Sequence, residues 1–283
     1  MKKSLSIEDV RLVADGLDHP ECVVYHPDGF LFAGGEAGQI YRITLDGDVE
    51  ELANTGGFIL GMAISPQRDW LAVCDLKKKC VWRLDLFSLR LTRFANGAPD
   101  HLFNIPNFVC FDKNGCLYVS ESGAFREVSG KILKFNPDGK GMVWSEGPFN
   151  FANGMAIDHS GTFIYVVCTF SPSIERVSIK PDGSAGKREV FVSFDKIVPD
   201  GLCFDAGGNL LVSCYAPNTI LVVSPDRTID VLVEDWEAHT LCNPTNIAFG
   251  GLSFDDLFIA NLGRWHISRI KNNARGLPLV CHV

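Results

Sequence analysis

A segment of about ten residues recurs six times along this chain of 283 residues, at intervals of 39 to 47 residues. An interval of roughly 40–50 residues is typical of a propeller blade or a solenoid unit. The six copies read HPECVVYHPDG, ILGMAISPQRD, IPNFVCFDKNG, FANGMAIDHSG, VPDGLCFDAGG and NPTNIAFGG. Aligned without gaps they share one position, which we call the slot, held by Glu21, Leu60, Asn107, Asn153, Asp200 and Thr245.

Each repeat contains four short apolar runs. In the fifth repeat these are GLCF, NLLVSCY, TILVVS and DVLVED, separated by DAGG, APN and PDRT. The runs suit strands, and the glycine, asparagine and proline between them suit turns. Because no apolar series has helical spacing, we predict an all-β fold. The prediction is a six-bladed β-propeller of four-stranded antiparallel blades.

The last repeat lacks a fourth apolar run. It supplies NIAF, DLFIAN and HISRI, whereas the N-terminal DVRLVADG resembles the fourth runs GMVWSEG and REVFVSF of other repeats. We therefore predict that the N-terminal strand joins the last blade and that residues 1–283 form a single propeller domain. The alternative is that residues 4–16 are a frayed tail.

Composition limits the partners. A net charge of −8 argues against nucleic-acid binding, which needs a basic surface. The N-terminus has no signal-peptide core, and no apolar run approaches the roughly 18 residues of a membrane span. These features predict a cytoplasmic protein that binds neither nucleic acid nor membrane, and leave its oligomeric state open. The 10 cysteines form no C-x-x-C pair, so we expect buried free thiols.

Four of the slot residues carry oxygen ligands. First strands line the channel of a propeller, so their starts converge at one end of it. Two carboxylates and two amides there suit a hard cation, and Ca²⁺ takes 6–8 oxygen ligands. Mg²⁺ and Mn²⁺ are weaker candidates, and Zn²⁺ is weaker still because the slot has no histidine or cysteine. The alternative is that Asn and Asp before Gly are ordinary turn residues.

The sequence resembles the SMP-30/gluconolactonase/luciferin-regenerating-enzyme family of six-bladed propellers. The resemblance extends over essentially the whole chain. It is carried by Pro20-Glu21, Asn107 before FVCFDKNG, Asn153-Gly154-Met155-Ala156, Pro199-Asp200-Gly201 and the C-terminal LGRWHISRI with GLPL.

The resemblance implies a calcium-type metal bound by Glu21, Asn153 and Asp200, with Asn107 as a ligand or substrate contact. It also implies that Asp200 is the base or nucleophile of an enzyme that opens lactones. Sugar-lactonase members often carry an arginine where this chain has Ile105, so a less polar ring or a different polar anchor is favoured here.

Three further residues are expected to contact the substrate. Glu121 and Tyr215 follow second strands and so reach the slot end, and His101 precedes the third blade. Glu121 could instead support the residues that contact substrate, or be a solvated loop charge, and Tyr215 could be a packing residue. The leading hypothesis is a metal-dependent lactonase with a small-molecule lactone substrate. The alternatives are a phosphotriesterase or other esterase at the same metal, or a non-catalytic ligand-binding propeller.

Overall fold

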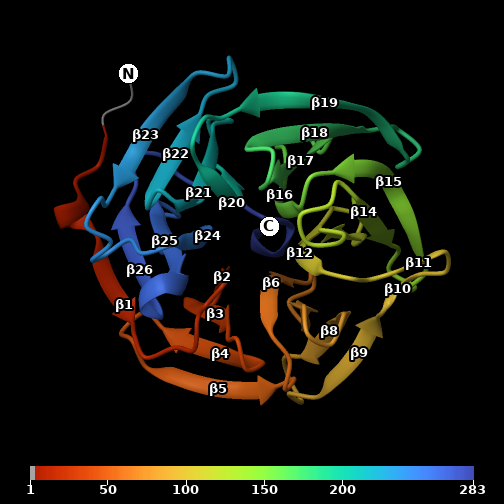
Figure 1. Ribbon diagram of the computed structural model, residues 1–283. Coiled ribbons are helices and arrows are strands. Elements are labelled where there is room, and N and C mark those ends of the chain that lie inside the picture. The colour runs from red at the N-terminus through yellow and green to blue at the C-terminus, as the bar shows by residue number, and fades with distance from the viewer. Residues whose placement is uncertain (1–3) are drawn as a thin grey trace.

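Six four-stranded sheets stand around a central channel in the computed structural model, which describes residues 4–283 (Figure 1). Consecutive strands of each sheet pair antiparallel, so the predicted six-bladed all-β propeller is confirmed. Within residues 4–283 the helical elements are three short 3₁₀ turns: η1 (Ile7–Asp9), η2 (Leu262–Arg264) and η3 (Val280–His282). None of the helices in this part of the chain is long and apolar enough to cross a membrane.

The strands occupy equivalent places in each blade, from the channel outward. The first strands are β2 (Val23–His26), β6 (Ile59–Ile64), β12 (Pro106–Phe111), β16 (Ala152–Ile157), β20 (Val198–Phe204) and β24 (Pro244–Gly250). The second strands are β3 (Phe30–Gly34), β7 (Trp70–Asp75), β13 (Leu117–Glu121), β17 (Phe163–Cys168), β21 (Leu210–Ala216) and β25 (Asp256–Asn261). The third strands are β4 (Gln39–Thr44), β8 (Cys80–Asp85), β14 (Gly130–Phe135), β18 (Ser173–Ile179), β22 (Thr219–Val223) and β26 (His266–Lys271). The fourth strands are β5 (Val49–Asn54), β9 (Leu91–Ala95), β15 (Gly141–Phe149), β19 (Ala185–Ser193), β23 (Ile229–Glu234) and β1 (Arg11–Ala14).

The sixth blade is completed by the other end of the chain. Its sheet has the order β1-β26-β25-β24, and Arg11 of β1 pairs with Arg269 of β26. The prediction that the N-terminal strand closes the ring is therefore confirmed, and the frayed-tail alternative is wrong for β1. A further hairpin, β10 (Gly97–Ala98) with β11 (His101–Leu102), lies outside the blades, between β9 and β12 in the chain.

The apolar core lies between the blades. Six clusters of buried hydrophobic side chains each join two neighbouring blades, as when Cys74 of β7 packs with Val109 of β12. A blade therefore buries its faces only against its neighbours, as in other repeat proteins. The cysteines of residues 4–283 are free and mostly buried, which confirms the prediction for their role.

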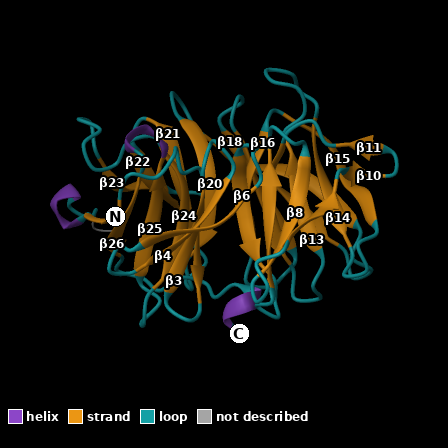
Figure 2. Cartoon of the chain, turned by 90° about the horizontal axis from the view of Figure 1, so that it is seen from below, coloured by secondary structure: helices purple, strands orange, loops and turns teal. Residues whose placement is uncertain are grey.

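The C-terminal segment, residues 275–282, closes one end of the channel (Figure 2). The Leu277 N–H donates to the carbonyl of Phe204 in blade 5, at 2.9 Å. The Arg68 side chain from blade 2 donates to the carbonyl of Cys281, at 2.6 Å. This segment, for which the sequence predicted no role, thus links distant blades across the end opposite to the slot.

Candidate metal centre

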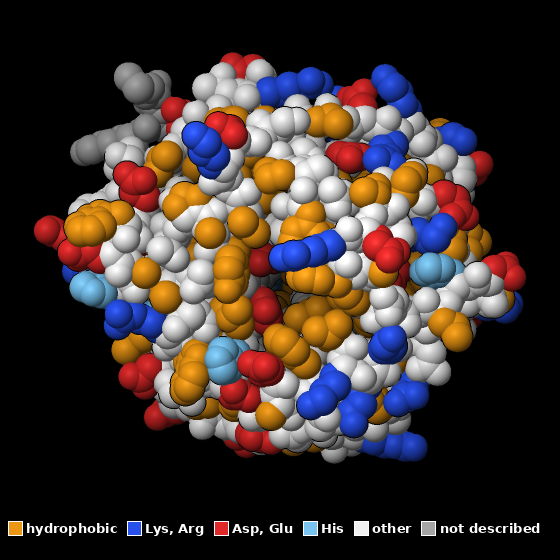
Figure 3. Space-filling view, viewed as in Figure 1, with side chains coloured by type: hydrophobic (Ala, Val, Ile, Leu, Met, Phe, Trp, Pro, Cys, Tyr) orange, Lys and Arg blue, Asp and Glu red, His pale blue; other side chains and the backbone are white. Residues whose placement is uncertain are grey.

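All six slot residues meet at one end of the channel. They line a pocket of about 10 Å³, room for one water molecule or one small ion. Figure 3 views this face: acidic side chains lie inside a central hollow, and hydrophobic side chains together with a basic side chain border it. The structure therefore brings together the four oxygen-bearing residues that the sequence repeat grouped: Glu21, Asn107, Asn153 and Asp200.

The first strands are irregular at the slot. In five blades the pairing of the first and second strands breaks register across the slot residue. In β16, for example, regular pairing stops at Ala152 and resumes at Met155, so Asn153 lies in a bulge. A bulge re-aims side chains, here toward the channel axis. Asn153 and Asp200 thus lie within strands, and the turn interpretation of their Asn-Gly and Asp-Gly pairs is wrong.

Glycine after the slot lets the first strands approach one another. A Cβ on Gly154 would lie 2.5 Å from the carbonyl oxygen of Asp200, and one on Gly201 would lie 2.7 Å from that of Thr245. Any larger residue would push these strands apart. The glycines therefore keep the slot narrow enough for side chains of different blades to share one ion.

Two hydroxyl groups fix the slot amides. The Asn107 Nδ2 group donates to Ser122 Oγ at 3.1 Å, and Ser122 donates to the carbonyl of Ala152 in the next blade at 2.7 Å. The Asn153 Nδ2 group donates to Thr169 Oγ1 at 3.2 Å. Thr169 in turn donates to the carbonyl of Pro199, at 3.0 Å. Because each amide nitrogen is engaged by its own blade, each Oδ1 remains available to the pocket.

The two slot carboxylates oppose each other's ionisation. Burial, the Asp200 charge and then the Glu36 charge raise the pKa of Glu21 well above its ordinary value. Burial raises the pKa of Asp200 from 3.8 to about 7, although a hydrogen bond from Asn153 lowers it in part. None of the residues lining this pocket in the described chain is Lys, Arg or His. A divalent cation with oxygen ligands fits this donor set, because it supplies the positive charge that the pocket lining does not.

Glu121, expected as a substrate contact, is fully buried in a different role. Its carboxylate accepts the backbone N–H groups of Asn104, Ile105 and Gly123, each at 3.0 Å. These bonds hold the loop that leads into β12. They lower the pKa of the Glu121 carboxyl, but burial raises it by more, so the pKa lies above its ordinary value. Glu121 therefore positions the segment carrying Ile105 and Asn107, and its oxygens do not face the pocket.

The other expected contacts divide into two groups. Tyr215 lies at the slot end: burial raises its pKa first, and the nearby Glu21 and Asp200 charges raise it further. His101 does not reach the pocket, because it belongs to the hairpin β10–β11 at the outer side of blade 3 (Figure 1). Burial and the Lys131 charge lower its pKa, while Glu146 of the outermost strand β15 raises it.

Three phenylalanines that the sequence analysis did not single out form a cluster at the slot end. Phe151 and Phe170 have ring centroids 4.6 Å apart, and Phe125 lies edge-on to both, at 6.0 and 5.2 Å. Phe125 is 62% exposed and Phe170 is 37% exposed. In the sequence, Phe151 and Phe170 each lie next to a residue that helps to hold the slot side chains in place. This adjacency is the sequence signal from which the two phenylalanines could have been identified.

Fold and site together define a six-bladed propeller with an oxygen-lined centre at one mouth of its channel. The chain belongs to the SMP-30/gluconolactonase/LRE-like family, whose family model matches residues 19–262.

Individual relatives are distant. Strictosidine synthase-like protein 6 of Arabidopsis thaliana is 26% identical over 224 residues, 72% of this chain and 58% of that protein. The chain spans 38 to 58% of the length of the curated relatives that it matches. A gluconolactonase from Xanthomonas campestris superposes with a TM-score of 0.79 at 19% identity, covering 93% of this chain and 89% of that one. Regucalcin from Agrobacterium tumefaciens, a calcium-binding protein, gives 0.82 at 17% identity, covering 99% and 98%. These two likenesses are of fold.

Proposed function

We propose that this protein is a metal-dependent lactonase that binds Ca²⁺ in the slot. The observation that carries the proposal is the convergence of two carboxylates and two amides in a pocket whose lining has no basic residue. Membership of a family that is named in part for gluconolactonase supports the reaction class. The calcium-binding protein among the structural neighbours supports the choice of ion.

The ligands in this proposal are Glu21, Asn153 and Asp200, with Asn107 as a fourth ligand or as a substrate contact. A Ca²⁺ ion takes 6–8 oxygens, so positions are left for water and for a substrate carbonyl. When bound, the ion would act as a Lewis acid on that carbonyl. Because the pocket has room for one ion, the lactone itself must bind above it, at the mouth.

Asp200 is the residue that we assign to the chemistry. As a general base it would take the proton of a water that attacks the lactone carbonyl carbon. As a nucleophile it would attack that carbon itself and form an acyl-enzyme, which water then hydrolyses. Label found in the Asp200 carboxylate after a single turnover in ¹⁸O-labelled water would exclude the general-base route, since only attack of water on the Asp200 carbonyl carbon of an acyl-enzyme places it there.

The mouth favours a lactone with an apolar ring or substituent. The exposed Phe125 and Phe170 stand where a substrate above the slot would pass, and Ile105 offers no charge to a polyol. Exposed aromatic side chains gathered beside a pocket are a common mark of a binding site. We therefore propose an aliphatic or aromatic lactone before a sugar lactone.

The test is a lactone panel with EDTA-treated protein, with and without added Ca²⁺. The panel contains gluconolactone, an aliphatic γ-lactone, an aromatic lactone and a paraoxon-type phosphotriester. Turnover of a lactone that needs Ca²⁺ would support the proposal, and a preference for the apolar members would support the substrate class. Turnover of the phosphotriester alone would replace the lactonase with a phosphotriesterase. Folded protein that binds Ca²⁺ but turns over no member would favour a ligand-binding propeller.

A further inference from the structure

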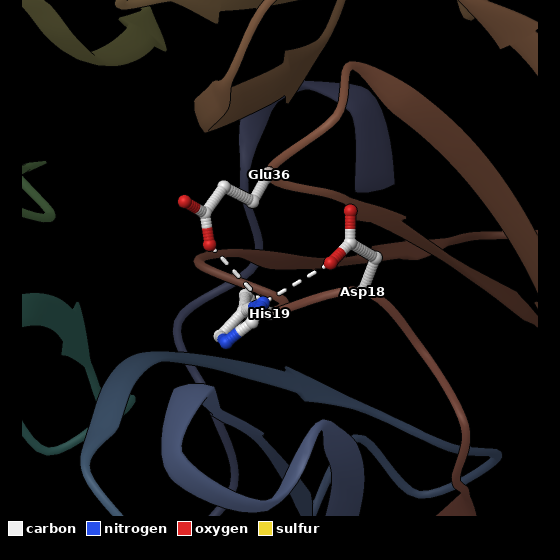
Figure 4. Close-up of side chains that lie close together, drawn as sticks. All are labelled: Asp18, His19 and Glu36. Carbon is white, nitrogen blue, oxygen red and sulfur yellow. Dashed lines mark hydrogen bonds and ion pairs between the residues drawn. The ribbon is translucent and has the colours of Figure 1, made fainter.

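A second group of metal-binding side chains lies on the rim, apart from the slot. Asp18 and His19 precede β2, and Glu36 follows β3, so all three belong to blade 1 (Figure 4). One ligand atom from each lies within 4.8 Å of the other two. The side chains of Asp18 and His19 are each 33% exposed and that of Glu36 is 50% exposed, so the group is open to ions from solution.

Both carboxylates converge on the same ring nitrogen. Asp18 Oδ1 lies 3.0 Å and Glu36 Oε2 lies 3.1 Å from His19 Nδ1. A ring nitrogen carries at most one hydrogen, so it cannot give both carboxylates a full hydrogen bond. Neighbouring ligand atoms around a metal with bonds of about 2.1 Å lie about 3.0 Å apart in an octahedron and about 3.4 Å apart in a tetrahedron. The two separations match the edges of such a polyhedron.

The three ligands are held in place by groups outside the cluster or by the backbone. The Ala37 N–H donates to Asp18 Oδ2 at 2.9 Å, which leaves Oδ1 directed at the histidine. The Trp265 ring packs against the His19 ring with centroids 4.6 Å apart. The Glu36 N–H donates to the Asp18 carbonyl at 3.0 Å, which ties the two loops together. Such outer contacts fix metal ligands before the metal binds.

Blade 1 differs here from three other blades. At the last residue of the second strand, Asp75, Glu121 and Asn261 each accept a backbone N–H from the loop that leads into the first strand. The strand register places Gly35 at the equivalent position of blade 1, one residue before Glu36, so blade 1 has no such side chain there. The cluster therefore lies where blade 1 departs from the pattern of these three blades.

We propose that Asp18, His19 and Glu36 form a second metal site, selective for a transition-metal dication such as Zn²⁺ or Co²⁺. One imidazole with two carboxylates suits these ions, whereas Ca²⁺ prefers oxygen ligands alone. Water completes the coordination on the exposed side. The slot and the rim site would thus hold different ions on the same face of the propeller. The competing interpretation is a protonated His19 paired with both carboxylates.

The experiment is a titration of the whole protein with Co²⁺ after saturation with Ca²⁺. Binding is followed by the visible absorption of Co²⁺ and by calorimetry. The test variants are His19→Gln and Glu36→Gln, whose side chains are partly exposed and belong to none of the hydrophobic clusters between the blades. The matched control is His239→Gln, because His239 Nδ1 faces a single carboxylate, Glu237, at 3.4 Å.

We expect the wild-type protein and the His239→Gln variant to bind one equivalent of Co²⁺ in the presence of Ca²⁺. Both test variants should bind it at least about 10-fold more weakly, since each has lost a direct ligand. A wild-type protein that takes up no Co²⁺, or a His19→Gln variant that binds it as the wild type does, would overturn the proposal. If the slot also takes Co²⁺, the wild type binds two equivalents, and loss of one in His19→Gln still identifies the rim site. Lactone turnover has no part in the readout, so a failed lactonase proposal leaves this result intact.

Discussion

The two ends of the channel differ in size and in chemistry. The slot end has a pocket of about 10 Å³ that is lined by two carboxylates and two amides. Toward the other end lies a cavity of about 660 Å³, whose channel wall includes Met62, Phe108, Met155 and Leu202. The C-terminal segment forms part of its lining.

This contrast shows that the volume of a cavity is a weaker guide to the functional end of the channel than the chemistry of its lining. The larger cavity has the size of many small-molecule sites. The smaller pocket holds two carboxylates whose pKa values are raised. Such an arrangement costs folding free energy unless a bound cation offsets that cost. Apolar residues along a channel need no such explanation, because packing alone accounts for them. We therefore assign the chemistry to the slot end, and the predictions below test that assignment.

The largest effect is expected at Asp200. The change Asp200→Asn keeps the size of the side chain but removes its charge and its basicity. If Asp200 is the general base, kcat should fall by about 10²–10⁴-fold. Steady-state kinetics of a lactone identified by the panel, at saturating Ca²⁺, is the measurement.

The control for this change lies at the opposite end. Asp182→Asn alters an exposed carboxylate beside the larger cavity and should leave kcat unchanged. Equal losses of kcat in Asp200→Asn and Asp182→Asn would mean that the slot end is no more important for the reaction than the opposite end. Activity that survives Asp200→Asn would contradict the proposed mechanism.

The next effect concerns Thr169, which touches Asn153 but not the pocket. Thr169→Val keeps the side-chain shape and removes both hydrogen bonds of the hydroxyl group. Ca²⁺ affinity should fall by about 10–100-fold, as for other groups that orient a metal ligand. Calorimetry with Ca²⁺ gives the dissociation constant, and circular dichroism checks the fold.

Ser213→Ala is the matched control for Thr169→Val. Ser213 also donates to a carbonyl of the next blade, that of Thr245 at 2.9 Å, but its hydroxyl bonds the backbone of Gly201 and no slot side chain. Its loss should lower stability with a smaller effect on Ca²⁺ affinity. If Thr169→Val and Ser213→Ala bind Ca²⁺ with the same affinity, Thr169 is a general link between blades and does not position Asn153.

The repeat predicted the fold and the four slot residues because both depend on local, recurring patterns. Turn residues mark the strands, and the equivalence of blades brings equal positions to one end. The hydroxyl bonds of Ser122 and Thr169 were not predicted, since they cross between blades and depend on the bulge at each slot. The partners of Glu121 were not predicted for a related reason: they are backbone N–H groups, which leave no signal in the sequence.

The effect of pH follows from the raised pKa of Asp200. In the metal-free folded protein this carboxyl binds its proton up to a pH of about 7, whereas in the unfolded chain it ionises near 3.8. Its contribution to stability is therefore present below pH 4 and is lost as pH rises through 7. Ca²⁺ binding requires the ionised form, so the gain in Tm on adding Ca²⁺ should increase from pH 5 to pH 8.

Differential scanning calorimetry with EDTA and with Ca²⁺ measures this gain at each pH. Asp200→Asn should show a smaller gain that varies less with pH, because Glu21 is then the one carboxyl of the proposed ligand set that can release a proton. A gain in the wild type that is constant across this range would mean that the pKa of Asp200 does not control metal binding.

The smallest effect on the site is expected from the far end. A Cβ on Gly276 would lie 2.3 Å from Phe249, so Gly276→Ala should disturb the C-terminal segment and destabilise the fold by about 1–3 kcal/mol. Each kcal/mol corresponds to a loss in Tm of roughly 2–4 °C in a domain of about this size.

Gly207→Ala is the control, since the atoms nearest to its added Cβ would lie at 3.3 Å and belong to side chains. Ca²⁺ affinity should be unchanged in both, because the C-terminal segment lines the larger cavity and none of its residues lines the slot pocket. A 10-fold loss of Ca²⁺ affinity in Gly276→Ala would show instead that closure of the far end sets the spacing of the blades at the slot, and the two ends would have to be treated as one coupled structure.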